Sequence, residues 1–189
     1  MAPSPRRLML RQGTADAHSA LDSMIGPFTS HQAYEAYLRG MARFRLPIED
    51  MIAQHSPIDM LQNWHPAMIL NEIRADLAAL GLQENVAPSP PPVPHALEEW
   101  LGVFYVLEGS SLGAKLLAKR AQSLGLTTTT GAAHLFEQAG NFSNWTAFIE
   151  VMEGVRDVDE ARMIAWANAT FDYAHRAFES TMNATCADC

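Results

Sequence analysis

Two side chains near the start of the chain, Arg11 and His18, are suited to holding a ligand that carries both a metal and a carboxylate. An imidazole is a common ligand for iron and other transition metals, and a guanidinium binds carboxylates through paired hydrogen bonds. Seven residues correspond to about two helical turns, so the two side chains point nearly the same way, about 10 Å apart. Histidine on an apolar helix face is also an ordinary core residue, so spacing alone leaves both interpretations open.

Further cations occur in the middle of the chain, where Lys115, Lys119 and Arg120 follow one another closely. On a helix, Arg120 projects on nearly the same side as Gly109 and Gly113. Lys119 lies on the flank of that side and Lys115 on the back. We interpret Lys115 as a solvated charge, and Lys119 and Arg120 as candidates for binding an anionic, planar ligand.

The helix that must position these groups carries glycine where helices disfavour it. The run from Trp100 to Arg120 has helical spacing, and Gly109 and Gly113 lie one turn apart on one of its faces. Each glycine costs a helix interior roughly 1 kcal/mol relative to alanine. A strip of bare backbone allows either a neighbouring helix or a flat ligand to approach closely. The glycines alone favour helix packing, and the rest of the sequence must decide.

The composition indicates one soluble domain. The chain has 189 residues, of which 48% are hydrophobic, and this is enough to bury a core. Thirteen Lys and Arg against twenty-one Asp and Glu leave a formal charge of −8, which disfavours nucleic acid and anionic membranes as partners. The sequence shows neither a secretory signal nor a membrane span, so we expect a cytoplasmic protein.

Helical periodicity covers most of the chain, and no segment alternates as a strand would. We expect an all-α fold of seven or so helices within a single domain over residues 1–185. A proline-rich loop at 86–94 lies inside that domain, and residues 186–189 form a flexible tail. The tail contains both cysteines, Cys186 and Cys189, with no second pair or neighbouring histidine to complete a zinc site. The expected helices span 6–25, 29–55 with a kink or stop at Pro47, 64–80, 100–124, 132–138, 143–152 and 157–178.

Two segments resemble known motifs. Tyr105–Ala114 (YVLEGSSLGA) is similar to the distal-helix signature of bacterial haem oxygenases, and Leu10–Asp22 (LRQGTADAHSALD) is similar to their proximal helix. Residues 131–135 and 144–148 also have counterparts in bacterial members, and the similarity runs from about residue 8 to residue 178. The resemblance implies a single-domain, multi-helix bundle with a glycine-containing distal helix.

The same resemblance assigns roles to particular residues. His18 would be the proximal iron ligand, while Gly109 and Gly113 would line the distal face of haem. Ser110 stands where animal members have an aspartate that orders distal water. The cofactor-binding residues implied are Arg11, Thr14, Lys119 and Arg120, with Arg11 and Lys119 at positions that bind the haem propionates. Two departures leave the site of ring cleavage open: Gly26 or a neighbour replaces a lysine that some members have, and Lys115 replaces a residue that is often small.

The implied activity is cleavage of haem, as substrate and prosthetic group, by O₂ and reducing equivalents to biliverdin, Fe²⁺ and CO. No Gly-x-Gly-x-x-Gly motif is present, so electrons would come from an external reductase or ferredoxin. The alternative is a non-catalytic haem carrier or sensor that uses the same His18. A di-iron enzyme is disfavoured because no Glu-x-x-His occurs, and a thiamin-degrading enzyme because no cysteine lies in the helical core. A pure interaction module would bind no haem.

Overall fold

The structure is a computed structural model that describes residues 4–55, 57, 61, 64–84 and 90–182. Within these residues every regular element is an α-helix, which confirms the all-α prediction. In chain order the helices are α1 (Pro5–Gly13), α2 (Ala15–Ile25), α3 (His31–His55), α4 (Leu70–Ala79), α5 (Leu97–Gly109), α6 (Ser111–Ser123), α7 (Ala133–Gly140), α8 (Phe142–Gly154) and α9 (Glu160–Met182).

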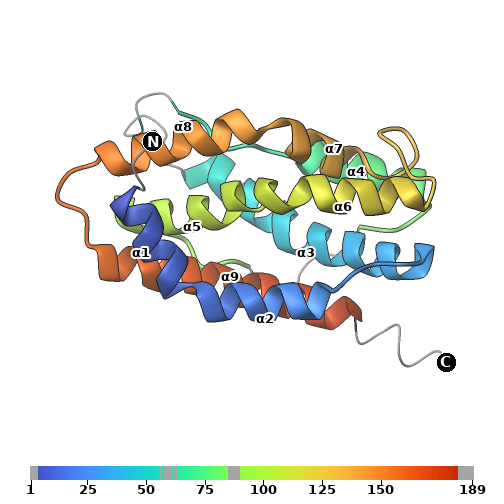
Figure 1. Ribbon diagram of the computed structural model, residues 1–189, viewed down its shortest axis with the longest axis horizontal. Coiled ribbons are helices and arrows are strands. Elements are labelled where there is room, and N and C mark those ends of the chain that lie inside the picture. Colours follow the sequence, from blue (N-terminus) through green and yellow to red (C-terminus); the bar gives the residue numbers. More distant parts are fainter. Residues whose placement is uncertain (1–3, 56, 58–60, 62–63, 85–89, 183–189) are drawn as a thin grey trace.

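The helices pack around one hydrophobic core. Figure 1 shows α5 and α6 along the middle of the molecule, with α7 and α8 along its upper edge and α2 and α9 along its lower edge. Helix α9 packs against α2, α3 and α5, so it joins the N-terminal helices to the central ones. The core is rich in aromatic side chains contributed by α3, α5, α8 and α9, among them Tyr34, Tyr37, Phe104, Phe148 and Phe178.

Helices α5 and α9 are in backbone contact at Gly102. A Cβ atom at this position would lie 2.5 Å from the carbonyl oxygen of Met163 and 2.9 Å from the backbone nitrogen of Ala167. Only a glycine permits so close an approach. The tight helix packing that the sequence suggested for Gly109 and Gly113 therefore occurs about two turns earlier in α5, at a glycine that the sequence pattern did not single out.

The single helix predicted over 100–124 is wrong, because the helix is broken at Ser110. The residue keeps helical dihedral angles (φ −60°, ψ −27°), but the hydrogen-bond pattern changes and the Gly113 N–H donates to the Ser110 carbonyl. The Ser110 hydroxyl donates to the Leu107 carbonyl at 2.6 Å, and the Ser111 hydroxyl donates to the Glu108 carbonyl at 2.7 Å. Serine hydroxyls thus bond to carbonyls at the break, where the regular ladder is disturbed.

The helix predicted over 6–25 is also divided, at Thr14. This residue adopts φ −117° and ψ 5°, and both its N–H and its hydroxyl donate to the Leu10 carbonyl. Asn168 of α9 donates to the Gly13 carbonyl at 2.9 Å, which holds the end of α1 in place. The two breaks account for the difference between the seven helices expected and those observed in the described residues.

Other boundaries shift for local reasons. Helix α4 begins at Leu70 rather than at Trp64, because buried carboxylates bind the backbone of the preceding segment: Glu108 accepts from the Ala67 N–H, and Glu49 accepts from the Ile69 and Leu70 N–H groups. Helix α3 continues through Pro47. The Ser30 hydroxyl, not Thr29, accepts from a first-turn N–H of α3, and α8 begins after Asn141 rather than at Ser143.

Part of the sequence-based description falls outside the described residues. Cys186, Cys189 and the tail belong there, as do residues 86–89 of the proline-rich loop. One described stretch, Leu97–Ser123, is long and apolar enough to cross a membrane by length and composition alone. Half of its most apolar window is buried inside the fold, as expected for the core helices α5 and α6, so it is weak evidence for a span.

Candidate functional site

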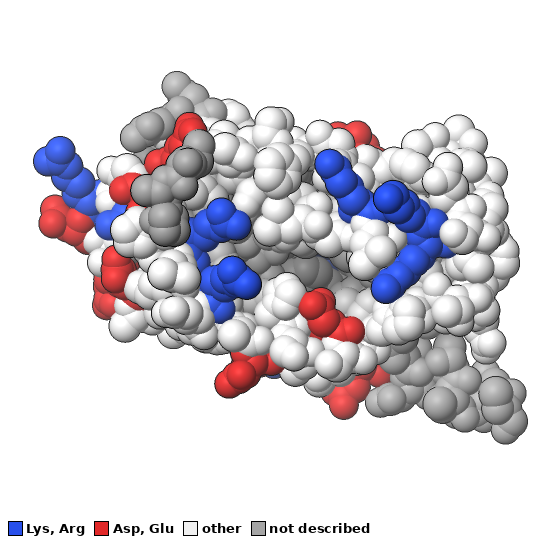
Figure 2. Space-filling view, in the orientation of Figure 1, with Lys and Arg blue, Asp and Glu red and all other residues white. Residues whose placement is uncertain are grey.

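The two broken helices touch at one point and then line a hollow. The Tyr105 hydroxyl of α5 lies near the side chain of Thr14, which stands between α1 and α2. From this contact α2 and α5–α6 run in the same direction, and Figure 2 shows that the surface is hollowed in this part of the molecule. His18 lies one turn beyond Thr14, and Gly109 lies one turn beyond Tyr105. The two residues therefore lie on the two helices that run along this part of the molecule.

His18 presents an accessible imidazole. Its side chain is 60% exposed, and the ring packs edge-on against Phe171 of α9, with 5.6 Å between the ring centroids. Its Nδ1 atom lies 3.2 Å from a carboxylate oxygen of Asp22, one turn further along α2. A carboxylate at Nδ1 favours the tautomer that carries a proton there, which leaves the Nε2 lone pair for a metal. The arrangement therefore leaves one ring nitrogen available to bind a metal.

The backbone of α6 is bare at Gly113. A Cβ atom added there would meet no other atom within 4 Å, and one at Gly109 would meet only the Trp145 ring, at 3.6 Å. The neighbouring Leu112 and Leu116 side chains are 47% and 56% exposed. No helix covers this strip within the described part of the chain, so the packing interpretation fails at Gly113. A flat, apolar ligand would fit against such a wall.

An aromatic corner closes the end of the hollow near the Thr14 contact. The ring of Trp145, from α8, lies 5.8 Å from the ring of Tyr105, and the Arg7 guanidinium lies 5.7 Å from the Trp145 centroid. Burial raises the pKa of Tyr105 above its ordinary value, although the nearby Thr14 side chain and the positive charges of Arg7 and Arg11 oppose the shift. Arg7, Tyr105 and Trp145 were not among the residues predicted for the site. Tyr105 could have been predicted, because it lies one turn before Gly109 on the same face of the helix.

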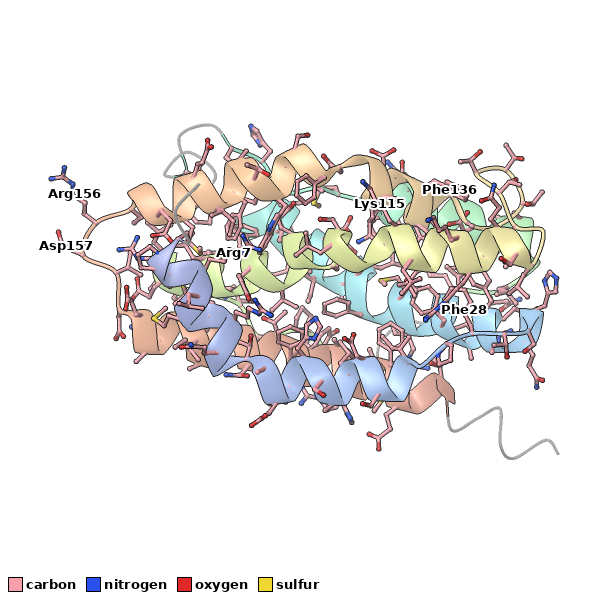
Figure 3. The ribbon with its side chains drawn as sticks, viewed as in Figure 1. Arg7, Phe28, Lys115, Phe136, Arg156 and Asp157 are labelled. Atoms are coloured by element: carbon pink, nitrogen blue, oxygen red, sulfur yellow. The ribbon has the colours of Figure 1, made fainter. Side chains whose placement is uncertain are left out.

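Cations lie at both ends of the hollow. Figure 2 shows two groups of Lys and Arg side chains there, and Figure 3 places Arg7 on α1 and Lys115 on α6. Arg11 and Lys119 are exposed, and Arg120 is partly buried. None of these three forms an ion pair with another residue that the structure describes. In a chain of formal charge −8, these unpaired cations make the hollow suitable for an anionic ligand.

Comparison with known proteins gives a consistent result. No family model matches the chain. The heme oxygenase PigA of Pseudomonas aeruginosa is 29% identical over 182 residues, which cover 90% of this chain and 91% of the relative. A heme oxygenase of Xanthomonas campestris pv. campestris is 31% identical over 145 residues, covering 75% of this chain and 85% of the relative.

The chain belongs to the haem oxygenase family. The crystal structures of NO- and CO-bound heme oxygenase from Neisseria meningitidis share its fold, with a TM-score of 0.74 and 23% identity over 94% of this chain and 92% of that one. Family membership and the shared fold confirm the resemblance drawn from the two motifs. They also remove the di-iron and thiamin-degrading alternatives.

The hollow fits haem by the chemistry of its donors. Among the described residues, no group of three or more His, Cys, Asp or Glu side chains gathers to hold a metal ion. A lone imidazole is suited to a metal whose remaining ligands come from its own macrocycle. The bare strip at Gly113 accommodates the flat face of such a ring, and the unpaired cations accommodate its acid groups.

Two predicted site residues serve mainly to hold the helix breaks. The Ser110 hydroxyl, besides donating to the Leu107 carbonyl, accepts a hydrogen bond of 2.8 Å from Gln138 of α7. Thr14 is only 3% exposed and bonds within the fold. The break at Thr14 also places Arg11 and His18 on different helices, so the separation expected from one straight helix no longer applies.

Proposed function

We propose that this protein is a haem oxygenase that binds haem in the hollow and cleaves it with O₂ and externally supplied electrons to biliverdin, Fe²⁺ and CO. The observations that carry the proposal are the exposed His18 imidazole on α2 and the bare backbone of Gly113 on α6. When bound, haem supplies the redox-active iron and is itself the ring that is cleaved. The protein's part is to hold and orient that ring.

Each wall has a separate task in this proposal. His18 would hold the iron through Nε2, while the Asp22 carboxylate keeps the proton at Nδ1 and fixes the ring orientation. Gly109 and Gly113 would leave room beside a bound haem for O₂. Arg11, Lys119 and Arg120 bind the propionates. Ser110 and Thr14 act by holding the two helix breaks.

The remaining sequence-based expectations belong to the same proposal. Electrons come from a separate reductase or ferredoxin, since the sequence carries no Gly-x-Gly-x-x-Gly motif. Residues 1–185 act as one catalytic domain, and the protein works in the cytoplasm.

The proposal is tested by titrating the purified protein with haemin and then adding an electron-donor system under air. We expect a one-to-one Soret complex in the wild type, followed by bleaching to a biliverdin spectrum. In His18→Ala the His-ligated spectrum is lost, and free imidazole restores it by replacing the missing ligand. His31→Ala, which removes an exposed imidazole at the start of α3, serves as the control.

The outcomes separate the competing functions. Tight binding without bleaching, with several flavin and ferredoxin donors tried, supports a haem carrier or sensor instead. An unchanged spectrum in His18→Ala removes His18 from the iron. No complex with haemin at all overturns the proposal and leaves only the fold.

A further inference from the structure

Two neighbouring residues of α5 contact two neighbouring residues of α8. On the buried side, Asn144 Nδ2 donates to a carboxylate oxygen of Glu108 at 3.0 Å. On the side of the hollow, the Trp145 ring lies against Gly109, where a Cβ atom would come within 3.6 Å of it. Glu108 is 2% exposed and Gly109 is partly exposed. The Glu108–Asn144 hydrogen bond is therefore buried, whereas the Gly109–Trp145 contact reaches the surface.

The polar half of this contact is directional. One carboxylate oxygen of Glu108 accepts from the Ala67 N–H at 2.7 Å, and the other accepts from Asn144. The Asn144 amide also donates to the His65 carbonyl at 3.1 Å. Both oxygens and the amide nitrogen are therefore engaged, and a buried carboxylate in such a network tolerates little displacement. The first turn of α8 is fixed against the last turn of α5.

The apolar half of the contact shapes the hollow. Trp145 is 4% exposed and packs beside Tyr105, with the Arg7 guanidinium over its ring. The residue follows Asn144 directly, so a displacement of Asn144 moves the indole relative to Gly109. A planar ligand that slides along the bare strip meets this aromatic corner at the closed end.

We propose that Glu108 and Asn144 are positioning residues that hold Trp145 against Gly109 and so determine how deeply haem enters the hollow. This inference rests on the proposed function. The depth of entry decides which edge of the porphyrin lies beside the break at Ser110, and therefore which biliverdin isomer is formed. Neither residue touches the ligand; both act through Trp145.

The experiment compares Glu108→Gln, Asn144→Asp and the double variant that combines them. Glu108→Gln brings an amide NH₂ group against one of the two donors that Glu108 binds, the Ala67 N–H or the Asn144 amide. Asn144→Asp brings a carboxylate against two acceptors, the Glu108 carboxylate and the His65 carbonyl. In the double variant, the Gln amide donates to the new carboxylate, which restores one complementary bond. Asn144 is only partly buried, so Asn144→Ala removes the same hydrogen bond at a position that tolerates substitution better. This variant tests the inference if the Glu108 variants fail to fold.

The first readout uses haem-free protein. The tryptophans are replaced by 5-fluorotryptophan, and the ¹⁹F resonance of Trp145 is assigned with Trp145→Phe. We expect this resonance to shift or split in each single variant and to return toward its wild-type position in the double variant. The second readout is the biliverdin isomer ratio, which we expect to change by about twofold or more in the single variants, as coupled neighbours do.

Glu99→Gln is the matched control. Glu99 lies on the same helix, is 3% exposed and accepts hydrogen bonds from backbone amides and Arg162, but among the described residues it forms no hydrogen bond or ion pair with α8. This variant should lose stability without moving the Trp145 resonance or the isomer ratio. An equal shift in Glu99→Gln, or a wild-type resonance in the Glu108 and Asn144 variants, overturns the inference.

The two readouts separate this inference from the proposed function. If the resonance shifts but the isomer ratio stays constant, the residues hold Trp145 without seating the ligand, and the inference fails. If wild-type protein does not cleave haem, the proposed function fails, while the ¹⁹F signal still reports whether the pair holds Trp145.

Discussion

Arg11 stands on the last turn of α1, exposed and without an ion-pair partner in the described part of the chain. We expect Arg11→Ala to weaken haemin binding by about fivefold or less, since a partly exposed charge pair contributes little more. The His-ligated Soret spectrum should persist, because His18 belongs to a different helix. Haemin titration and analysis of the biliverdin isomers check this expectation.

Arg156→Ala is the control for that experiment, because Arg156 is another exposed cation, placed far from the hollow in Figure 3. If affinity and product ratio stay the same in Arg11→Ala, Arg11 is not part of the site.

A side chain at Gly113 should affect both the free energy of unfolding and the binding of haem. A Cβ atom there meets nothing in the haem-free protein, so Gly113→Ala should raise the free energy of unfolding by about 0.5–1 kcal/mol through helix propensity alone. The added methyl group should also stand where haem approaches, which weakens haemin binding and slows turnover. Urea unfolding of the haem-free protein and haemin titration measure the two effects.

Gly140→Ala provides the comparison, since a Cβ at Gly140 of α7 also meets nothing within 4 Å. It should be neutral or stabilising with no effect on haem. If Gly113→Ala binds haem as tightly as wild type, the bare strip is not the distal wall.

At the scale of elements, the backbones of α5 and α9 lie in direct contact at Gly102. We expect Gly102→Ala to lower the free energy of unfolding by about 1–3 kcal/mol, because its Cβ would overlap backbone atoms of α9, which cannot move aside as a side chain can. Urea unfolding of the variant gives the value. A stability equal to wild type would mean that the two helices can separate at no cost.

The existence and order of the helices follow from periodicity, but the two breaks do not. A run of helical spacing continues across Thr14 and across Ser110 with no proline to interrupt it. The breaks depend on contacts from elsewhere in the chain: Asn168 of α9 binds the Gly13 carbonyl, and Gln138 of α7 binds the Ser110 hydroxyl. Such contacts are invisible to a local pattern.

At the scale of the whole molecule, two buried carboxyls of α5 should give opposite pH dependence. Although burial opposes it, the His95 and Ala96 amides and the Arg162 guanidinium lower the pKa of Glu99 below its ordinary value of 4.5. Burial raises the pKa of Glu108 above that value, despite the Ala67 and Asn144 hydrogen bonds.

The sign of each contribution follows from proton linkage. The folded protein binds a proton at Glu99 less tightly than the unfolded chain, so Glu99 stabilises the fold above pH 4.5 and this contribution is lost as the pH falls through the lowered pKa. For Glu108 the contribution is present below pH 4.5 and is lost as the pH rises through the raised pKa.

Urea unfolding at a series of pH values measures these contributions in wild type, Glu99→Gln and Glu108→Gln. The difference between wild type and Glu99→Gln should shrink toward acid pH. As the pH rises above 4.5, the free energy of unfolding of the wild type should fall relative to that of Glu108→Gln. Parallel curves for all three proteins would contradict both assignments.

The sequence by itself determined the helical class and the two motifs, and it singled out His18 as the candidate iron ligand, because these depend on residue types and short spacings. It could not decide whether a glycine serves packing or a ligand, since that depends on what lies opposite: the backbone of α9 at Gly102, and open space at Gly113. Nor could it predict that Trp145 of α8 and Thr14, which follows α1, both lie beside Tyr105 of α5. Only the tertiary structure brings those distant segments together.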